Sequence, residues 1–224
     1  MNLRLYQWKG NPTIISEIRI LFFYSNPRIF FIKGEIKLSY EFPLIEEALK
    51  DGRLGKAVVQ IAKNIERILL KQLKLDEDYE PSDIEILPVI IVHDSLYSAP
   101  ALNYIVHYWM KEQIEILKGK AELSKAIFTN ILPITIVEID TLILFEEDFH
   151  QNRLDLTEML KKYQQHVNFE ATSFNSEKDY HEHFYISALP FSEFARDYAH
   201  EKNIQFKMDR LSKLLASFGI DNNL

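Results

Sequence analysis

The first forty residues are rich in β-branched and aromatic side chains, which favour strands over helices. Strands are expected at Leu3 to Trp8 and at Ile14 to Tyr24. The turn-forming sequence Ser25-Asn26-Pro27 then leads into another expected strand, Arg28 to Ser39. The pattern therefore predicts a β-hairpin in which the second and third of these strands are neighbours.

The apolar positions change to helical spacing after Pro43. A short helix is expected at Leu44 to Lys50, closed by Asp51-Gly52, and a longer one from Leu54 to Leu75. In the longer helix the apolar residues recur every three or four positions and form one stripe facing a core: Leu54, Val58, Ile61, Ile65, Ile68 and Leu69. The opposite face is polar and mostly positive, and it carries Lys56, Gln60, Lys63, Arg67, Lys71 and Lys74.

The remainder of the chain alternates continuous apolar runs with helical patterns. After an acidic loop at Asp76 to Asp83, the runs Ile86 to Asp94 and Ile131 to Asp140 indicate buried strands of a parallel sheet. Further helices are expected at Ala99 to Leu117, Ala121 to Asn130, Thr141 to Phe149, Leu154 to Gln165, Phe191 to Glu201 and Met208 to Phe218, with a loop around Asn168 to His183.

These elements predict an α/β fold in which a mixed central sheet is flanked by helices. We expect residues 1–140 to form an α/β core and residues 141–224 to form a helical C-terminal extension packed on that core. A chain of 224 residues with 47% apolar side chains is long enough to bury one substantial core. The prediction is therefore a single compact domain.

The composition excludes several kinds of chemistry. There is no cysteine, so the chain has no disulfide, thiolate metal site or cysteine nucleophile. The six glycines form neither GxGxxG nor GxxxxGK[ST], so the usual glycine-built phosphate loops are missing. The longest apolar run, Leu87 to Val92, has the length of a strand, and the N-terminal sequence lacks the apolar core of a signal peptide. We expect a soluble cytoplasmic protein with no membrane segment.

Charge is unevenly distributed along the chain. The net charge is −7, yet the first 75 residues hold 13 of the 26 basic side chains and only 7 of the 33 acidic ones. The remaining residues are correspondingly acidic. The N-terminal part is therefore where contact with DNA is expected, with Lys56, Lys63 and Arg67 as candidate phosphate ligands.

Candidate catalytic side chains end the strand Arg28 to Ser39. Residues two apart in a strand share one face, so Glu35 and Lys37 lie on the same side. A carboxylate there is a suitable ligand for a hard cation such as Mg²⁺, and the carbonyl oxygen of Ile36 is a second one. The neighbouring ammonium can orient a metal-bound water and stabilise charge on a phosphate. These are the elements of metal-assisted phosphodiester hydrolysis.

The order of a hairpin, E-x-K and an amphipathic helix resembles the PD-(D/E)xK restriction-endonuclease-like superfamily, in its Mrr-like and nuclease-related-domain branches. The resemblance covers roughly residues 14–140, and the motif positions lie in residues 14–70. It implies a Mg²⁺-dependent DNA endonuclease in which Glu35 is a metal ligand and Lys37 is the catalytic lysine. Gln60 is similar to the glutamine or lysine that such families place on the following helix.

The first motif of that superfamily departs from the expected pattern. An aspartate is usual on the first strand of the hairpin, whereas this chain reads Glu17-Ile18-Arg19, with arginine at the aspartate position. Glu17 lies on the same face as Arg19 and is the substitute ligand, so the predicted metal site consists of Glu17 and Glu35. A positive neighbour weakens cation binding. The alternative is a catalytically inactive nuclease-fold subunit that binds a partner protein, or a second copy of itself, in a defence or DNA-processing assembly.

Other interpretations stay open. Glu35 and Lys37 can be a solvated ion pair worth about 0–1 kcal/mol, and the basic helix face can be merely solvated. Polar residues at the ends of the two buried strands, His93 with Asp94 and Glu138 with Asp140, mark a second possible site. The histidines of the D-Y-H-E-H run, His181 and His183, are expected on a surface loop, and Tyr104, Tyr108 and Trp109 are expected to pack in a core or interface.

Overall fold

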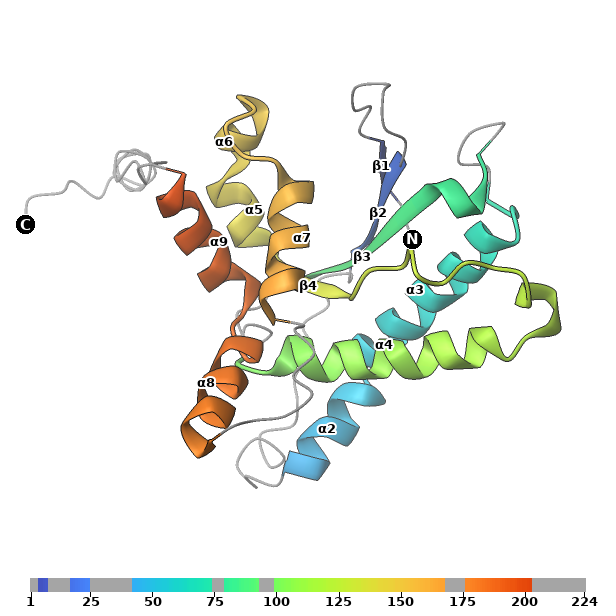
Figure 1. Cartoon of the computed structure of the whole chain (residues 1–224), viewed down its shortest axis with the longest axis horizontal. Helices are drawn as coiled ribbons and strands as arrows, with labels where there is room; N and C mark the ends of the chain where they lie inside the picture. The colour runs from blue at the N-terminus through green and yellow to red at the C-terminus, as the bar shows by residue number, and fades with distance from the viewer. Residues whose placement is uncertain are drawn as a thin grey trace, which may run out of the picture.

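A computed structural model describes residues 4–7, 17–24, 42–73, 79–92, 99–167 and 176–202. Within them lies a four-stranded sheet in the order β1 (Arg4–Gln7), β2 (Glu17–Tyr24), β3 (Ile84–Val92) and β4 (Thr135–Glu138). Strand β1 is antiparallel to β2, whereas β2, β3 and β4 are parallel to one another (Figure 1). The predicted mixed sheet flanked by helices is confirmed at this level.

Strand β3 is buried on both faces because it lies inside the sheet with helices on either side. Its side chains alternate between two cores: Ile86 and Ile90 join one apolar cluster, and Leu87 and Val89 join the other. Because both faces of β3 are buried, its sequence is apolar at almost every position, and this pattern predicted a central parallel strand. The result is a three-layer arrangement of helices, sheet and helices.

One layer consists of α2 (Phe42–Lys50), α3 (Arg53–Leu69) and α4 (Leu102–Lys118), and α4 runs horizontally below the sheet in Figure 1. The predicted apolar stripe of α3 is buried against β3 and α4, as expected from its spacing. Buried Asn103 of α4 accepts a hydrogen bond at Oδ1 from the backbone N–H of Ile136, at 2.8 Å, and so fixes α4 to β4.

The other layer is formed by helices that follow β4: α5 (Ile139–Leu144), α6 (Glu146–His150), α7 (Leu156–Val167), α8 (Glu177–Ser187) and α9 (Phe191–Glu201). Its core is aromatic, with Tyr163 packed edge-on against Phe191 at 5.4 Å between ring centres. The Tyr163 hydroxyl donates to the Leu189 carbonyl at 2.8 Å, which satisfies the phenol in this buried setting.

Several predicted boundaries are wrong. Helix α3 ends at Leu69 rather than Leu75, because Lys71 adopts a left-handed conformation with φ of 54° and the chain closes in a C-terminal turn. Only the 3₁₀ turn η3 (Ala121–Leu123) occurs where a helix was expected at 121–130. Helix α8 occupies part of the loop that was predicted around residues 168–183. The single helix expected at 141–149 is divided into α5 and α6. Strand β4 is shorter than the predicted strand 131–140.

Strand β2 is paired along both of its edges over its central part. A strand has two hydrogen-bonding edges, and residues Arg19 to Phe22 use one for β1 and the other for β3. The expected strand Arg28 to Ser39, and with it the predicted hairpin, lies outside the described residues, as does the expected helix Met208 to Phe218. Strand β3, distant in sequence, is the parallel neighbour of β2. Among the described helices, none is long and apolar enough to cross a membrane.

Candidate nucleic-acid interface

An open groove of about 420 Å³ lies where the end of α2, the first half of α3 and the middle of α4 come together. Its walls hold three lysines, one carboxylate and one amide, and they are formed by Lys50, Asp51, Gly55, Lys56, Val59, Gln60, Lys63 and Trp109. Three residues of the sequence prediction, Lys56, Gln60 and Lys63, therefore line one groove.

Gly55 sets the close contact between α2 and α3 that shapes this groove. A Cβ atom at position 55 would lie 1.8 Å from the carbonyl oxygen of Lys50. That atom belongs to the backbone and cannot rotate away, so the junction requires glycine. The short Asp51-Gly52 connection and this contact hold Lys50 and Lys56 on the same groove.

The outward face of α3 carries a row of cations. Lys56, Lys63 and Arg67 are exposed, and among the described residues no carboxylate forms an ion pair with any of them. They recur at positions that return to one side of a helix. Three uncompensated positive charges thus follow the helix along the groove and beyond it, a pattern suited to a polyanion.

Lys50 has a different environment. Its Nζ donates to Oε2 of Glu112 on α4, at 2.9 Å, and this hydrogen bond raises the pKa of the ammonium above its usual value. The pair joins the end of α2 to α4. Lys50 is therefore a neutralised structural member of the wall. The positive charge of the groove comes from Lys56 and Lys63 of α3, and the groove also holds the carboxylate of Asp51.

Gln60 lies half-buried between Lys56 and Lys63. Its Nε2 donates to Oδ1 of buried Asn64, at 3.4 Å, which uses one of the two amide hydrogens. An amide has a second hydrogen and a carbonyl oxygen for other partners. Gln60 is thus placed to hydrogen-bond a ligand in the groove beside the two lysines.

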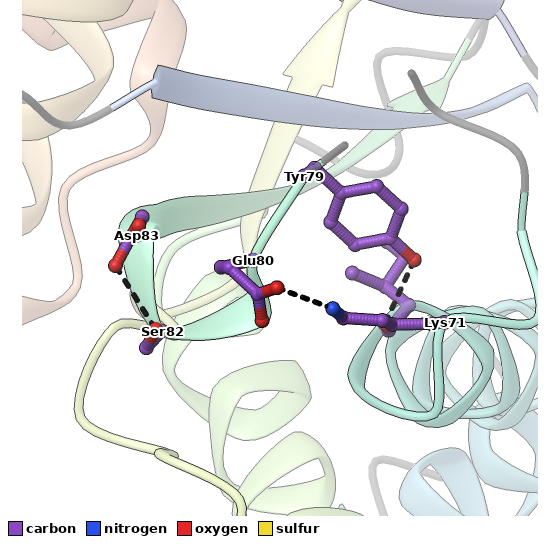
Figure 2. A network of polar contacts seen from close by, with 6 residues as sticks. Lys71, Tyr79, Glu80, Ser82 and Asp83 are labelled. Atoms are coloured by element: carbon purple, nitrogen blue, oxygen red, sulfur yellow. Dashed lines mark hydrogen bonds and ion pairs between the residues drawn. The ribbon is translucent and has the colours of Figure 1, made fainter. Parts of the chain in front are cut away.

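The far end of the predicted basic face is neutralised. Lys71 pairs with Glu80 at 2.6 Å, in a network where the Tyr79 hydroxyl donates to the Ile68 carbonyl at 2.9 Å (Figure 2). Glu66 of α3 is paired with Lys120 at 2.5 Å. The cation row is consequently Lys56, Lys63 and Arg67, while Lys74 lies outside the described residues.

The predicted catalytic pair, Glu35 and Lys37, lies outside the described residues. The predicted metal ligand Glu17 opens β2, where its backbone pairs with Ile84, and Arg19 pairs with Ile86. In the part of the chain that the structure describes, no three acidic or histidine side chains are grouped to hold a metal ion.

At the second possible site, formed by the polar residues at the ends of the two buried strands, Glu138 has a structural role. Glu138, the last residue of β4, accepts a hydrogen bond at Oε1 from the Ser192 hydroxyl at 3.0 Å, which links the sheet to α9. Asp140 lies in the first turn of α5. His93 and Asp94 are outside the described residues.

The histidines of the D-Y-H-E-H run are on helix α8, so their predicted placement on a loop is wrong. Two residues apart on a helix, His181 and His183 point in different directions. Sequence reasoning also missed Lys50, Asp51 and Trp109 as groove residues. Only the turn signal Asp51-Gly52 marked the junction on which they meet.

Comparison of the chain with protein-family models, with curated proteins and with solved structures finds no match.

Proposed function

We propose that this protein binds nucleic acid through the groove of α2, α3 and α4, and that Mg²⁺-dependent hydrolysis of DNA phosphodiesters is its activity. The observation that carries the binding proposal is the row of uncompensated cations, Lys56, Lys63 and Arg67, beside a groove that contains Gln60. Lysine and arginine supply most of the sequence-independent affinity for a phosphate backbone.

Catalysis is proposed from the E-x-K resemblance to the PD-(D/E)xK superfamily. The donors it supplies, Glu17 and Glu35, are carboxylates, which suit Mg²⁺. A bound Mg²⁺ would supply Lewis-acid activation of the phosphoryl group. Lys37 would orient the attacking water and stabilise the developing negative charge, and Gln60 would hydrogen-bond the phosphate. Lys56 and Lys63 would hold the backbone on either side of it.

The alternative proposal is a nuclease-fold subunit that binds without cleaving. Arg19 at the position of the superfamily aspartate favours it, because a cation there opposes metal binding.

Binding is tested with a fluorescent DNA oligonucleotide and the double variant Lys56→Glu with Lys63→Glu. We expect at least about a tenfold loss of affinity and a shallower dependence on salt, because two phosphate contacts are removed. Lys125→Glu, which changes an exposed lysine outside the groove, is the control and leaves affinity nearly unchanged. Equal affinities for all three proteins would refute the proposed interface.

Cleavage is tested by incubating plasmid and linear DNA with the protein and Mg²⁺ or Mn²⁺, beside Glu35→Ala and Lys37→Ala variants. Loss of cleavage in both variants supports the enzyme. Binding that depends on Lys56 and Lys63, without cleavage by the wild-type protein, supports the non-catalytic subunit.

A further inference from the structure

Two tyrosines on α4 expose their rings. Tyr104 and Tyr108 are 57% and 56% exposed, although this helix is otherwise packed against α3 and the sheet. Residues four apart on a helix lie one above the other on the same side, about 5–6 Å apart between Cβ atoms. The two rings therefore form one aromatic surface. The expected core packing is confirmed for Trp109, which is buried, whereas Tyr104 and Tyr108 lie outside the core.

This aromatic surface borders the groove. Tyr108 precedes Trp109, which lines the groove and donates from Nε1 to Glu46 of α2 at 3.3 Å. Glu112, one turn after Tyr108 on the same side of α4, pairs with the groove lysine Lys50. The ring surface thus continues from the α4 wall of the groove.

Two carboxylates near this wall, Glu112 of α4 and Glu46 of α2, have partners. Glu112 is paired with Lys50, and Glu46 accepts the indole hydrogen of Trp109. The ion pair with Lys50 reduces the repulsion that a polyanion would meet from Glu112 at the α4 wall. The opposite wall supplies the uncompensated lysines of α3. A chain that lies in the groove and extends over α4 therefore meets the lysines of α3 inside the groove and the exposed aromatic rings beside it.

That combination discriminates between forms of nucleic acid. A positively charged groove with aromatic rings beside it binds single strands, because phosphates follow the cations while bases stack on the rings. In a duplex the base faces are already stacked inside the helix. We infer that the groove takes single-stranded nucleic acid, with Tyr104 and Tyr108 as the base-stacking surface. This inference rests on the proposed nucleic-acid binding and specifies its ligand.

The test measures binding of labelled oligo(dT) and of a duplex of the same length by fluorescence anisotropy. The wild-type protein is expected to prefer the single strand. The double variant Tyr104→Ala with Tyr108→Ala is expected to lose about tenfold or more in single-strand affinity, since stacking contributes about 1–3 kcal/mol per base. Duplex affinity is expected to stay nearly constant.

Two controls separate stacking from other roles. Tyr104→Phe with Tyr108→Phe retains both rings and should retain single-strand affinity, and Tyr185→Ala removes an exposed tyrosine of α8, with no expected effect. Sedimentation of each variant shows whether the rings hold two copies of the chain together. A dimer lost in the alanine variant while single-strand affinity is unchanged assigns the rings to self-association and overturns the inference.

The remaining outcomes distinguish this inference from the proposed function. One outcome is that Lys56→Glu with Lys63→Glu weakens binding but the tyrosine variants do not; another is that the wild-type protein prefers the duplex. In either case the groove binds nucleic acid without base stacking, and only this inference fails. If the wild-type protein binds neither oligonucleotide, the proposed nucleic-acid binding fails and this inference fails with it.

Discussion

His107 of α4 is a histidine buried without a hydrogen-bond partner at Nδ1 among the described residues. Burial, and to a smaller extent the positive charge of nearby Lys111, lowers the pKa of the imidazole from 6.5 to about 4. The other buried atom without a hydrogen bond, Oε2 of Glu85, is compensated differently, because it forms an ion pair with Lys161. His107 is therefore the group whose charging the fold opposes.

The free energy of unfolding is expected to decrease as the pH is lowered, because His107 is buried in its neutral form. Its folded-state pKa lies below the unfolded value, so the unfolded chain takes up a proton first as pH decreases. The contribution is complete above about pH 6.5 and is lost between about pH 6.5 and pH 4, by at most about 3 kcal/mol. Urea denaturation at several pH values, compared with His107→Leu, measures the difference. The variant should lose less stability on acidification.

The control for this measurement is His150→Gln. His150 is largely exposed on α6, so its replacement should leave the pH dependence as in the wild-type protein. A His107→Leu variant that loses stability in parallel with the wild type between about pH 6.5 and pH 4 contradicts the assignment to His107.

At the residue scale, the sequence predicted the chemical types of the site better than their contacts. The spacing of Lys56, Gln60, Lys63 and Arg67 was enough to place them on one helix face, because helical periodicity is local. It did not reveal that Lys71 would be neutralised by Glu80, or Lys50 by Glu112, since each partner comes from a different element.

At the scale of elements, the junction of α2 and α3 depends on Gly55. Gly55→Ala is expected to destabilise the protein by about 2 kcal/mol or more, because the added Cβ would overlap the Lys50 carbonyl unless α2 moved. The same movement would open the groove and weaken DNA binding. Chemical denaturation and the oligonucleotide assay measure the two effects.

Gly119→Ala is the matched control. A Cβ at position 119, after α4, has its nearest neighbour at 3.5 Å, and φ of −73° suits any residue. Its stability should differ from wild type by less than about 1 kcal/mol. If the two alanine variants are equally stable, the close contact at Gly55 does not constrain the fold.

The pairing of elements shows where local signals are insufficient. Strand propensity identified residues 17–24 and 86–92 as strand, but no local signal indicated that β2 pairs with β3, which is distant in sequence. A turn signal reports how the chain reverses over a few residues. Which strand finally occupies an edge depends on the two apolar cores, to which β3 contributes on both of its faces.

At the scale of the whole molecule, β3 joins the two helical layers, so we expect them to unfold together. Ile90→Ala on the α3 and α4 side should cost about 2–5 kcal/mol, and Val89→Ala should destabilise the same single transition from the other core. A Trp8→Phe background leaves Trp109 as the sole tryptophan, so its fluorescence is compared with far-UV circular dichroism. Coincident curves are expected.

Separate transitions for the two probes would mean that the helices after β4 form an independent unit. The prediction of one compact domain, with residues 141–224 packed on residues 1–140, would then be wrong. The nuclease activity, its Mg²⁺ and the partner stay predictions for the experiments above.

The sequence by itself determined the buried strands, the amphipathic helix α3 and its row of cations, because side-chain periodicity and helix or strand preference act over a few residues. Only the tertiary structure decided that β2 pairs with β3, that α2, α3 and α4 enclose a groove, and which charges remain uncompensated. These features arise from contacts between residues far apart in the chain, such as Lys50 with Glu112. Their formation depends on how the two cores are filled.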